Sequence, residues 1–402
     1  MDQNTKTIRW GIMGLGNIAH KFAQDLIKIK DAQLYAVASR TKEKATEFAS
    51  NYGVAQIYGD YKDLVNDANI DAIYIATPHV LHKENTLLCL EQGIAVLCEK
   101  PFAMNSTELA IMISKAKEKK LLLMEALWTS FLPHYQYVIK ALKNKTYGNL
   151  LKMEASFGFF RAFNNDSRLF KISLCGGSLL DIVIYPIFAA LSAIGKPESM
   201  EATATFFDNG ADSSCNMIFN YKNGLKAYLK SSLLEDLPTE AIFYCEKGTI
   251  KINRQFHCPS TITITVDGKE EYKEDDLDAG TRLLVEEAPE GKGKGKELFE
   301  KLKAYKEQLL SIDPEMKKEI EVGLPLDLTI PPTSSEAGKS DWSYAYFHMT
   351  PTIAAITILS KFQNDVRNSE SKAVEFCHKQ IGQVEIIYDQ FQAFAGTNTQ
   401  YL

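Results

Sequence analysis

The sequence offers little to suggest a metal site, a disulfide framework or a membrane span. Its 402 residues contain seven cysteines, and no two of them form a C-x-x-C pair. An odd number of scattered cysteines inside apolar runs is typical of reduced core thiols. No uninterrupted apolar run reaches the roughly 18–20 residues of a membrane span, and the N-terminus lacks the pattern of a secretory signal. We therefore expect a cytoplasmic protein without a metal site.

An excess of positive charge is missing as well. The chain has 45 Lys and Arg residues against 51 Asp and Glu residues, a formal charge of −6 at pH 7. This balance argues against nucleic acid or an anionic membrane as a partner and leaves a small-molecule substrate as the expectation. The sequence also shows no nucleophile–histidine–acid set and no internal repeat. Its length predicts two or three domains.

The first 125 residues alternate short apolar runs with helical patterns. Runs without polar alternation are typical of strands that are covered on both faces, as in a parallel sheet. The expected strands are residues 8–13, 34–38, 71–76, 94–98 and 121–124. This alternation predicts an open, doubly wound α/β sheet, whose ligand crevice lies at the C-terminal ends of the strands.

A glycine-rich turn, "GLGNIA", follows the first expected strand and matches the pattern G-x-G-x-x-A. The first glycine permits a tight turn, the second lets the backbone approach a pyrophosphate, and the helix N-terminus stabilises the anion. A turn that merely needs glycine is the alternative. We expect a dinucleotide to contact Gly14, Gly16, Asn17 and Ile18.

The residues that follow the second expected strand indicate whether the cofactor is NAD or NADP. An NAD-selective site places Asp or Glu there for the ribose 2′-hydroxyl. This chain instead has Ser39 and Arg40, with Lys42 and Lys44 close behind. A hydroxyl and a guanidinium suit a 2′-phosphate, so we predict NADP, with a solvated basic loop as the alternative.

The run 94–98 leads directly into "EKPFAMN". Glu and Lys are poor strand formers and costly to bury, so Glu99 and Lys100 belong at an open strand end where a crevice can use them. Hydride transfer to or from an alcohol needs a proton acceptor or donor at the reacting oxygen. Lys100 stands where the nicotinamide half of the cofactor is expected.

Residues 151–266 contain strand-like runs separated by turn signals, and several of the runs alternate with period two. A helical pattern, 176–195, interrupts them. Asp181 and Tyr185 are four residues apart and therefore face the same way on this helix. Pro186 removes a backbone donor, which predicts a loosened helix near Ile182.

Residues 1–273 resemble the Gfo/Idh/MocA oxidoreductase family, and within it the NADP-dependent dihydrodiol and D-xylose dehydrogenase group. The resemblance is carried by "GLGNIA", "ATPHVLH", "CEKPFAMN", "MEALWTSFLP" and "GGSLLDIVIYP". It implies a Rossmann domain over 1–125 and an α+β substrate domain over 126–273 with a large, mostly antiparallel sheet, here C-terminally incomplete. Homodimers formed through that sheet are common in the family.

The resemblance also implies site residues. Tyr185 stands where the wider family has a histidine and is expected to be the acid/base. A nearby Lys100 would lower the pKa of the phenol, with Asp181 orienting or tuning the pair. Further residues expected to contact the cofactor are Thr77, Pro78, His82, Glu99, Lys100 and Trp128.

Structural alternatives stay open for several of these residues. Tyr185 and Trp128 are also compatible with plain core positions, and Glu99 with a structural or ribose-side hydrogen bond. His79 is compatible with an ordinary loop residue. Three phenylalanines either line the pocket or pack the sheet: Phe157, Phe159 and Phe160.

Beyond residue 273 the sequence has a different character. Residues 274–296, which include "EGKGKGK", read as a connector, and 297–402 as a separate α-helical segment. Residues 275–402 resemble part of the first helical, periplasmic domain of the gliding-motility/type IX secretion shaft family (GldM/PorM). The motifs are "KGKELFEKLKAYKEQLL" and "DWSYAYFHMTPTIAAITILSKFQNDVRNSESKAVEFC". We interpret the chain as a chimera of two structurally independent units, with a genuine bifunctional protein as the alternative.

For residues 1–273 we predict an NADP-dependent dehydrogenase that acts on CH–OH or dihydrodiol CH–CH groups of a sugar or an aromatic trans-dihydrodiol. A non-catalytic NADP-binding sensor is the alternative within the same fold, because fold alone does not establish chemistry. A structural role in gliding motility or type IX secretion, through the C-terminal segment, is the third possibility.

Overall fold

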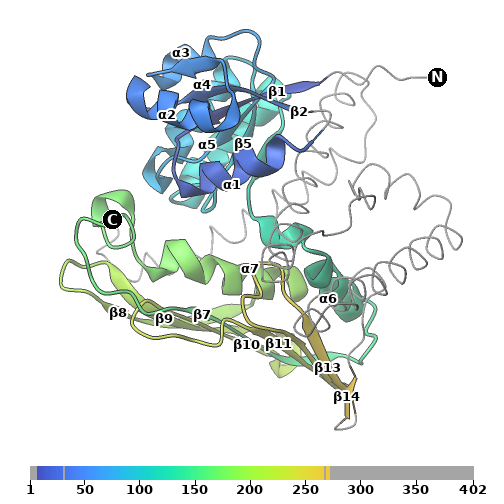
Figure 1. Cartoon of the computed structure of the whole chain (residues 1–402). Coiled ribbons are helices and arrows are strands. Elements are labelled where there is room, and N and C mark those ends of the chain that lie inside the picture. The colour runs from blue at the N-terminus through green and yellow to red at the C-terminus, as the bar shows by residue number, and fades with distance from the viewer. Residues whose placement is uncertain (1–6, 30–31, 267–268, 272–402) are drawn as a thin grey trace, which may run out of the picture.

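The computed structural model describes residues 7–29, 32–266 and 269–271 (Figure 1). The described chain forms two domains, a parallel α/β domain followed by an α+β domain built on a larger sheet. The expected connector 274–296 and helical segment 297–402 lie outside the described residues, so both stay predictions.

The first domain is a six-stranded parallel sheet with the strand order β3-β2-β1-β4-β5-β6. Its strands are β1 (Ile8–Met13), β2 (Ala32–Ala38), β3 (Gln56–Tyr58), β4 (Ala72–Ile75), β5 (Ala95–Cys98) and β6 (Leu123–Glu125). Its helical elements are α1 (Asn17–Leu26), α2 (Lys42–Tyr52), α3 (Tyr61–Val65), the 3₁₀ turn η1 (His79–Leu81), α4 (His82–Glu91) and α5 (Ser106–Lys119). This order reverses between β1 and β4, which creates a crevice at their C-terminal ends.

The strands of this sheet are mostly apolar because both of its faces are buried. Trp10 and Ile12 of β1 pack with Phe22 of α1 in one core cluster. Ile73 and Ile75 of β4 belong to the other cluster, together with residues of α4 and α5. The predicted doubly covered parallel sheet is therefore confirmed.

The second domain is an eight-stranded sheet with the order β14-β13-β12-β11-β7-β10-β9-β8. All neighbours are antiparallel except β7 and β10. Its strands are β7 (Leu150–Gly158), β8 (Ser199–Phe206), β9 (Asp212–Asn220), β10 (Lys226–Ser232), β11 (Ala241–Cys245), β12 (Gly248–Ile252), β13 (Ile262–Val266) and β14 (Lys269–Glu271). Its helical elements are η2 (Trp128–Phe131), α6 (Pro133–Lys143), η3 (Ile172–Leu174), η4 (Leu179–Val183), α7 (Ile184–Ala193) and η5 (Lys222–Gly224).

The helix that carries Asp181 and Tyr185 begins with a widened turn. Residues Leu179–Val183 form a π-helix, and α7 continues from Ile184. Pro186 has no N–H for the carbonyl four residues earlier, that of Ile182, so the ladder opens at this point. The predicted loosening near Ile182 is confirmed, and π-turns of this kind are frequent at functional sites.

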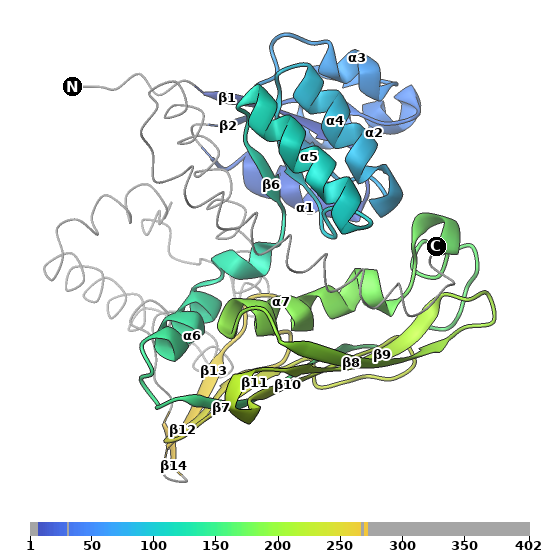
Figure 2. The ribbon, with the colours of Figure 1, turned by 180° about the vertical axis from the view of Figure 1, so that it is seen from behind.

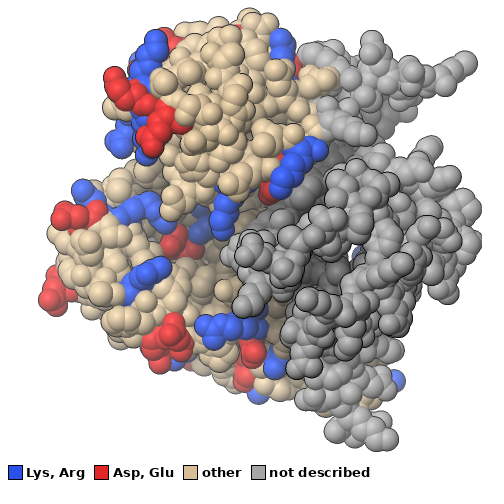
Figure 3. All heavy atoms as spheres, in the orientation of Figure 1, with Lys and Arg blue, Asp and Glu red and all other residues tan. Residues whose placement is uncertain are grey.

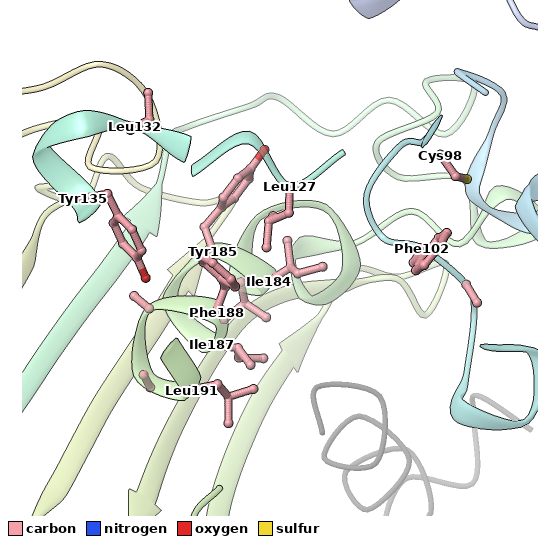
Figure 4. Close-up of a cluster of buried hydrophobic side chains, with 14 of the residues drawn as sticks. Cys98, Phe102, Leu127, Leu132, Tyr135, Ile184, Tyr185, Ile187, Phe188 and Leu191 are labelled. Carbon is pink, nitrogen blue, oxygen red and sulfur yellow. The ribbon is translucent and has the colours of Figure 1, made fainter. Parts of the chain in front are cut away.

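The same segment is unusually apolar. The run Ile172–Ala193 is long and apolar enough to cross a membrane by length and composition alone, but 78% of its most apolar window is buried inside the protein. Its side chains pack against the large sheet and α6, and the labelled residues Ile187, Phe188 and Leu191 form part of this core (Figure 4). The run therefore has the burial of a core helix, which is the commoner explanation of such a composition.

α6 and α7 lie on one face of the large sheet, the face turned toward the Rossmann domain (Figures 1 and 2). Among the described elements, none covers the opposite face. Polar and aromatic side chains project from that face: the Lys152 ammonium lies 4.1 Å from the ring centroid of Tyr244, whose hydroxyl donates to Glu154 at 2.9 Å.

Sequence reasoning missed two of the three shortest strands, β3 and β14, and predicted the third, β6. β3 and β14 have three residues each, and neither contains an apolar run long enough to signal a strand. β14 extends the sheet to Glu271, close to the boundary that the sequence predicted at residue 273. The domain boundaries themselves stay predictions.

Candidate active site

The glycine-rich turn after β1 is closed on one side and open on the other. Gly14 has φ +89°, and a Cβ there would lie 2.8 Å from the carbonyl oxygen of Ala76 at the end of β4. A Cβ on Gly16 would meet nothing within 4 Å. Gly16 is the N-cap of α1 and provides no side-chain cap. Gly14 is thus required by the protein's own packing, whereas Gly16 leaves the helix N-terminus open to an anion.

The end of β2 lies at the same edge of the sheet. Ser39 is buried and Arg40 is exposed. Among the described residues, no carboxylate lies within ion-pair distance of Arg40. An exposed guanidinium beside an open helix N-terminus fits the 2′-phosphate of NADP, and the whole arrangement accepts a dinucleotide on its chemistry and its available space.

His82 ties together two loops at this edge. It is fully buried, with Nε2 2.9 Å from the carbonyl oxygen of Thr77 and Nδ1 2.8 Å from that of Pro101. Asn85 adds a hydrogen bond from its side-chain amide to the Thr77 hydroxyl, at 3.0 Å. The neutral ring carries one N–H and donates to one of these two carbonyl oxygens, and the buried side chain packs between the Thr77–Pro78 loop and the loop after β5.

Lys100 and Asp181 bring the two domains together. The Lys100 ammonium donates to the backbone carbonyl of Asp181 at 2.7 Å and lies 3.3 Å from its carboxylate Oδ1. The side chains are only 16% and 13% exposed. Tyr185 is the third member, because the ammonium stands 5.2 Å from the centroid of its ring. The three predicted catalytic residues thus meet at the end of β5.

Tyr185 rises from α7 with its hydroxyl directed away from Ile187 and Leu191, toward the side where Leu127 lies (Figure 4). Its ring contacts His257 and Phe157, with centroid distances of 4.7 and 5.6 Å. His257 in turn stacks on Phe157 at 4.2 Å. These aromatic rings form one wall of the site.

The predicted lowering of the pKa of Tyr185 is wrong. Burial, followed by the charge of Glu99, raises the pKa of the Tyr185 phenol well above its ordinary value. The Lys100 ammonium forms its hydrogen bonds with Asp181 and faces the ring of the tyrosine instead of its hydroxyl. The phenol therefore keeps its proton at neutral pH.

Asp181 is the charged centre of the site. Burial opposes its ionisation, but Lys100, Arg168 and His79 outweigh burial and hold the pKa of Asp181 well below its usual range. Arg168 donates to the same Oδ1 that faces Lys100, at 3.2 Å. Asp181 is therefore a permanent anion that fixes the position of Lys100.

Two further carboxyls lie behind the loop after β5. Glu99 accepts a hydrogen bond from the hydroxyl of Tyr74 and another from the backbone N–H of Lys100. Glu125, at the end of β6, accepts from the backbone N–H of Phe102 at 2.9 Å, and burial raises its pKa to about 8. Both carboxyls hold the backbone that presents Lys100, which agrees with the structural interpretation of Glu99.

Trp128 lies where the two domains meet. It is half-buried in η2, and the ammonium of Lys21 on α1 stands 5.9 Å from the centroid of its ring. The predicted phenylalanines differ from one another: Phe157 belongs to the aromatic wall and contacts Phe159, whereas the side chain of Phe160 is 61% exposed. In the space-filling view a notch separates the two domains, with basic side chains at its edge (Figure 3).

Arg168, Glu125 and His257 were not predicted as site residues. Arg168 reaches Asp181 because its loop packs on Gly176, where a Cβ would lie 2.6 Å from the Arg168 carbonyl oxygen. His257 comes from the loop between β12 and β13. The "GG" pair before η4 was the available signal that something approaches this turn closely. Among the described residues, no group of three or more His, Cys, Asp or Glu side chains is arranged to hold a metal ion.

Two protein-family models match most of the described chain. The model described as "Oxidoreductase family, NAD-binding Rossmann fold" matches residues 8–127, and the "GFO/IDH/MocA C-terminal domain" matches residues 135–251. The chain belongs to the GFO/IDH/MocA oxidoreductase family. The family predicted from the sequence motifs is therefore confirmed.

Similar curated proteins include two dehydrogenases. The trans-1,2-dihydrobenzene-1,2-diol dehydrogenase of Xenopus tropicalis is 35% identical over 266 residues, which cover 65% of this chain and 79% of that protein. The scyllo-inositol 2-dehydrogenase (NADP(+)) IolU of Bacillus subtilis is 36% identical over 263 residues, or 64% of this chain and 79% of that protein.

The fold is shared with solved structures. The 3-ketoreductase KijD10 of Actinomadura kijaniata, in complex with NADP and TDP-benzene, superposes with a TM-score of 0.61 at 27% identity, covering 66% of this chain and 83% of that one. A levoglucosan dehydrogenase also has a TM-score of 0.61, and at 18% identity it supports the fold alone. The predicted Rossmann-plus-large-sheet architecture is confirmed.

A model of a second family matches a C-terminal part of the chain. The GldM N-terminal domain model matches residues 261–379. Its first residues overlap β13 and β14, which pair with β12 and with each other in the large sheet. The predicted resemblance to GldM is confirmed, and the described structure assigns residues 262–266 and 269–271 to the oxidoreductase fold.

Proposed function

We propose that the protein is an NADP-dependent oxidoreductase that moves a hydride between nicotinamide and a hydroxyl-bearing carbon of a sugar, cyclitol or aromatic trans-dihydrodiol. The observation that carries the proposal is the meeting of Lys100, Asp181 and Tyr185 at the end of β5, at the same edge of the parallel sheet as the open N-terminus of α1. The named relatives act on trans-dihydrodiols and scyllo-inositol, and the similar 3-ketoreductase has NADP bound.

In this proposal the C-terminal edge of the parallel sheet holds the cofactor. Gly14, Gly16, Asn17 and Ile18 receive the pyrophosphate, while Ser39 and Arg40 receive the 2′-phosphate. Thr77, Pro78, Glu99, Lys100 and Trp128 surround the nicotinamide half, and His82 holds two of these loops from behind. When bound, the cofactor supplies or accepts the hydride itself.

The chain supplies the proton. Tyr185 keeps its phenolic proton because burial raises its pKa, so it can donate that proton to a carbonyl oxygen during reduction. In the oxidative direction the phenol first loses its proton to solvent, and the resulting phenolate Oη accepts the proton of the substrate hydroxyl. The Lys100 ammonium, fixed by Asp181, stabilises negative charge that develops on the reacting oxygen.

The test is turnover by the purified full-length protein with NADP⁺ and a panel of aldoses, inositols and trans-dihydrodiols. Tyr185→Phe and Lys100→Met should each lower kcat by about 10²–10⁴-fold. Tyr135→Phe is the matched control, because Tyr135 is a buried tyrosine that bonds Ser192 on α7, outside the site. A non-catalytic NADP sensor would bind NADP(H) and turn over none of the panel.

The pH profile supplies an independent check of the tyrosine. Oxidation requires the deprotonated phenol, and its pKa is raised, so kcat for oxidation should keep rising with pH above neutrality. Reduction uses the protonated form and should stay flat over the same range. Stopped-assay or continuous rates in overlapping buffers measure this, and an oxidation rate that is flat above neutrality would argue against Tyr185 as the base.

We further propose that the protein acts in the cytoplasm as a homodimer formed through the large sheet. The support is the sheet face that the described elements leave uncovered, with its mixed aromatic, basic and acidic side chains. Light scattering of wild type and a Tyr228→Glu variant, whose residue is 39% exposed on that face, tests the assembly.

We also propose that the chain is a chimera of an oxidoreductase, residues 1–273, and a GldM-like segment.

A further inference from the structure

The proposed hydride transfer gives no role to His79 and Arg168, two basic residues next to Asp181. His79 is buried in the η1 turn, with 6% of its surface exposed. Arg168 comes from the loop before η3 and joins both partners: one guanidinium nitrogen lies 3.4 Å from His79 Nε2, the other 3.2 Å from Asp181 Oδ1. The Arg168 side chain is 46% exposed, so it lies at the mouth of the site.

The position of the proton on His79 follows from its partner. A guanidinium only donates hydrogen bonds, so Nε2 of His79 must accept. Burial, and then the charge of Lys100, lower the pKa of His79 well below its ordinary value, so the ring is neutral and carries its proton on Nδ1. Among the described residues, Nδ1 has no hydrogen-bond partner. A buried donor without an acceptor is costly, and a ligand that offers an acceptor at this position would satisfy it.

Asp181 offers the complementary group. Lys100 and Arg168 both bond its Oδ1, and within the described part of the chain no hydrogen bond is formed to its Oδ2. The neighbourhood therefore combines free donors on His79 and Arg168 with a free acceptor on Asp181. A hydroxyl group both donates and accepts, whereas a carboxylate or phosphate would meet the anionic Asp181. The site suits a neutral hydroxyl.

We propose that His79 and Arg168, with Asp181, bind the substrate hydroxyl next to the one that reacts. This inference rests on the proposed function, since Lys100 and Tyr185 define the reacting position. Lys100 and Arg168 bond the same oxygen atom, so the two hydroxyl positions are adjacent, as on neighbouring ring carbons. The aromatic wall of Phe157 and His257 accommodates the apolar part of the ring. His79 and Arg168 are thus specificity-determining residues for vicinal diols over mono-alcohols.

Equilibrium binding tests this without requiring turnover. Titration calorimetry would measure trans-1,2-cyclohexanediol and cyclohexanol against the full-length protein saturated with NADPH. Wild type should bind the diol at least about tenfold more tightly, as one or two hydrogen bonds that involve charged groups provide. His79→Phe and Arg168→Gln should each lose most of that preference while changing cyclohexanol binding less than about threefold.

Conservative and control variants separate recognition from folding. His79→Asn keeps a side-chain donor, and Arg168→Lys keeps the cation, so both should retain part of the preference. Arg161→Gln removes an exposed arginine of the neighbouring segment, whose guanidinium lies over Phe159, and should keep all of it. Thermal unfolding of each variant identifies any loss of diol preference that comes from misfolding. Where a variant is misfolded, the conservative replacement at the same position tests the role of that residue.

The outcomes distinguish the two proposals. Equal binding of diol and mono-alcohol by wild type, or full preference in both His79→Phe and Arg168→Gln, overturns the hydroxyl subsite. If wild type oxidises cyclohexanol and the diol equally well, the proposed function stands while the subsite fails. If wild type prefers the diol in binding but oxidises nothing in the substrate panel, the subsite stands and hydride transfer fails.

Discussion

Two glycine turns of this protein each precede a helix, yet they meet opposite surroundings. Gly16, before α1, has open space where a Cβ would be, and its helix N-terminus has no side-chain cap. Gly177, before η4, has φ +136°, and a Cβ there would lie 2.0 Å from Oδ1 of Asp212. The Asp212 carboxylate accepts from the backbone N–H of Leu179 at 2.7 Å and from the Ser178 hydroxyl at 2.8 Å.

The difference separates a binding feature from a structural one. In both turns the glycine lets an anion approach the first N–H groups of a helix. At η4 the anion is a carboxylate of the chain itself, and it fixes the helix that carries Asp181 and Tyr185. At α1 none of the described residues caps the helix with an anionic side chain, so the position is open to a ligand. A glycine pattern alone does not distinguish these cases; the occupant of the space does.

The largest expected effect comes from filling the occupied turn. Gly177→Ala should lower the free energy of unfolding by about 3 kcal/mol or more, since the new Cβ overlaps Asp212 and φ is positive. Gly195→Ala is the matched control: its φ is +98°, but nothing lies within 4 Å of its Cβ, so it reports backbone strain alone. Urea unfolding measures both variants, and equal losses would mean that the contact with Asp212 adds nothing.

Removal of the carboxylate should have the next largest effect. Asp212→Ala leaves the Leu179 N–H and the Ser178 hydroxyl without this acceptor and should cost about 1–3 kcal/mol. Because the clash disappears with the carboxylate, Gly177→Ala should cost less in the Asp212→Ala background than in wild type. A double-mutant cycle measures this coupling. Strict additivity of the two substitutions would contradict the proposed direct contact.

The sequence predicted buried strands and motif residues, but not the residues that reach the site from loops. β1 was predicted at its observed bounds and β4 and β5 within one residue, because continuous apolar runs signal buried strands directly. Lys100, Asp181 and Tyr185 were predicted together from their motifs, and they do meet. Arg168 and His257 were missed because both lie in loops, where no periodicity shows which distant residue a side chain reaches.

The error in the pKa of Tyr185 has a similar origin. A sequence can indicate that a lysine and a tyrosine meet, but not whether the ammonium faces the hydroxyl or the ring. Here it faces the ring and bonds Asp181. Burial then dominates and raises the pKa of the phenol. Orientation at close range is set by packing of both domains, which no local motif records.

At the open turn a substitution should affect binding and leave stability nearly unchanged. Gly16 has extended backbone angles, φ −92° and ψ −174°, that any residue adopts. Gly16→Val should therefore change the free energy of unfolding by less than about 1 kcal/mol and weaken NADP(H) binding by about tenfold or more, because its side chain occupies the space of the pyrophosphate. Fluorescence titration with NADPH measures the affinity. Unchanged affinity would show that this space is not the cofactor's.

The smallest expected effect concerns which dinucleotide the open edge prefers. Arg40 is exposed beside the buried Ser39, with no carboxylate of the described chain in ion-pair distance, so its guanidinium is available for a 2′-phosphate. Wild type should bind NADP(H) at least about tenfold more tightly than NAD(H), a difference of about 1.4 kcal/mol. Arg40→Asp should shrink or reverse that difference, because a carboxylate repels the phosphate and accepts hydrogen bonds from the ribose hydroxyls of NAD(H). Lys222→Asp makes the same charge change in the exposed turn between β9 and β10 and should leave the preference intact, which excludes a general effect of net charge. Equal affinities of wild type for the two cofactors would remove Arg40 from the cofactor site and leave the open turn as a dinucleotide site without selectivity.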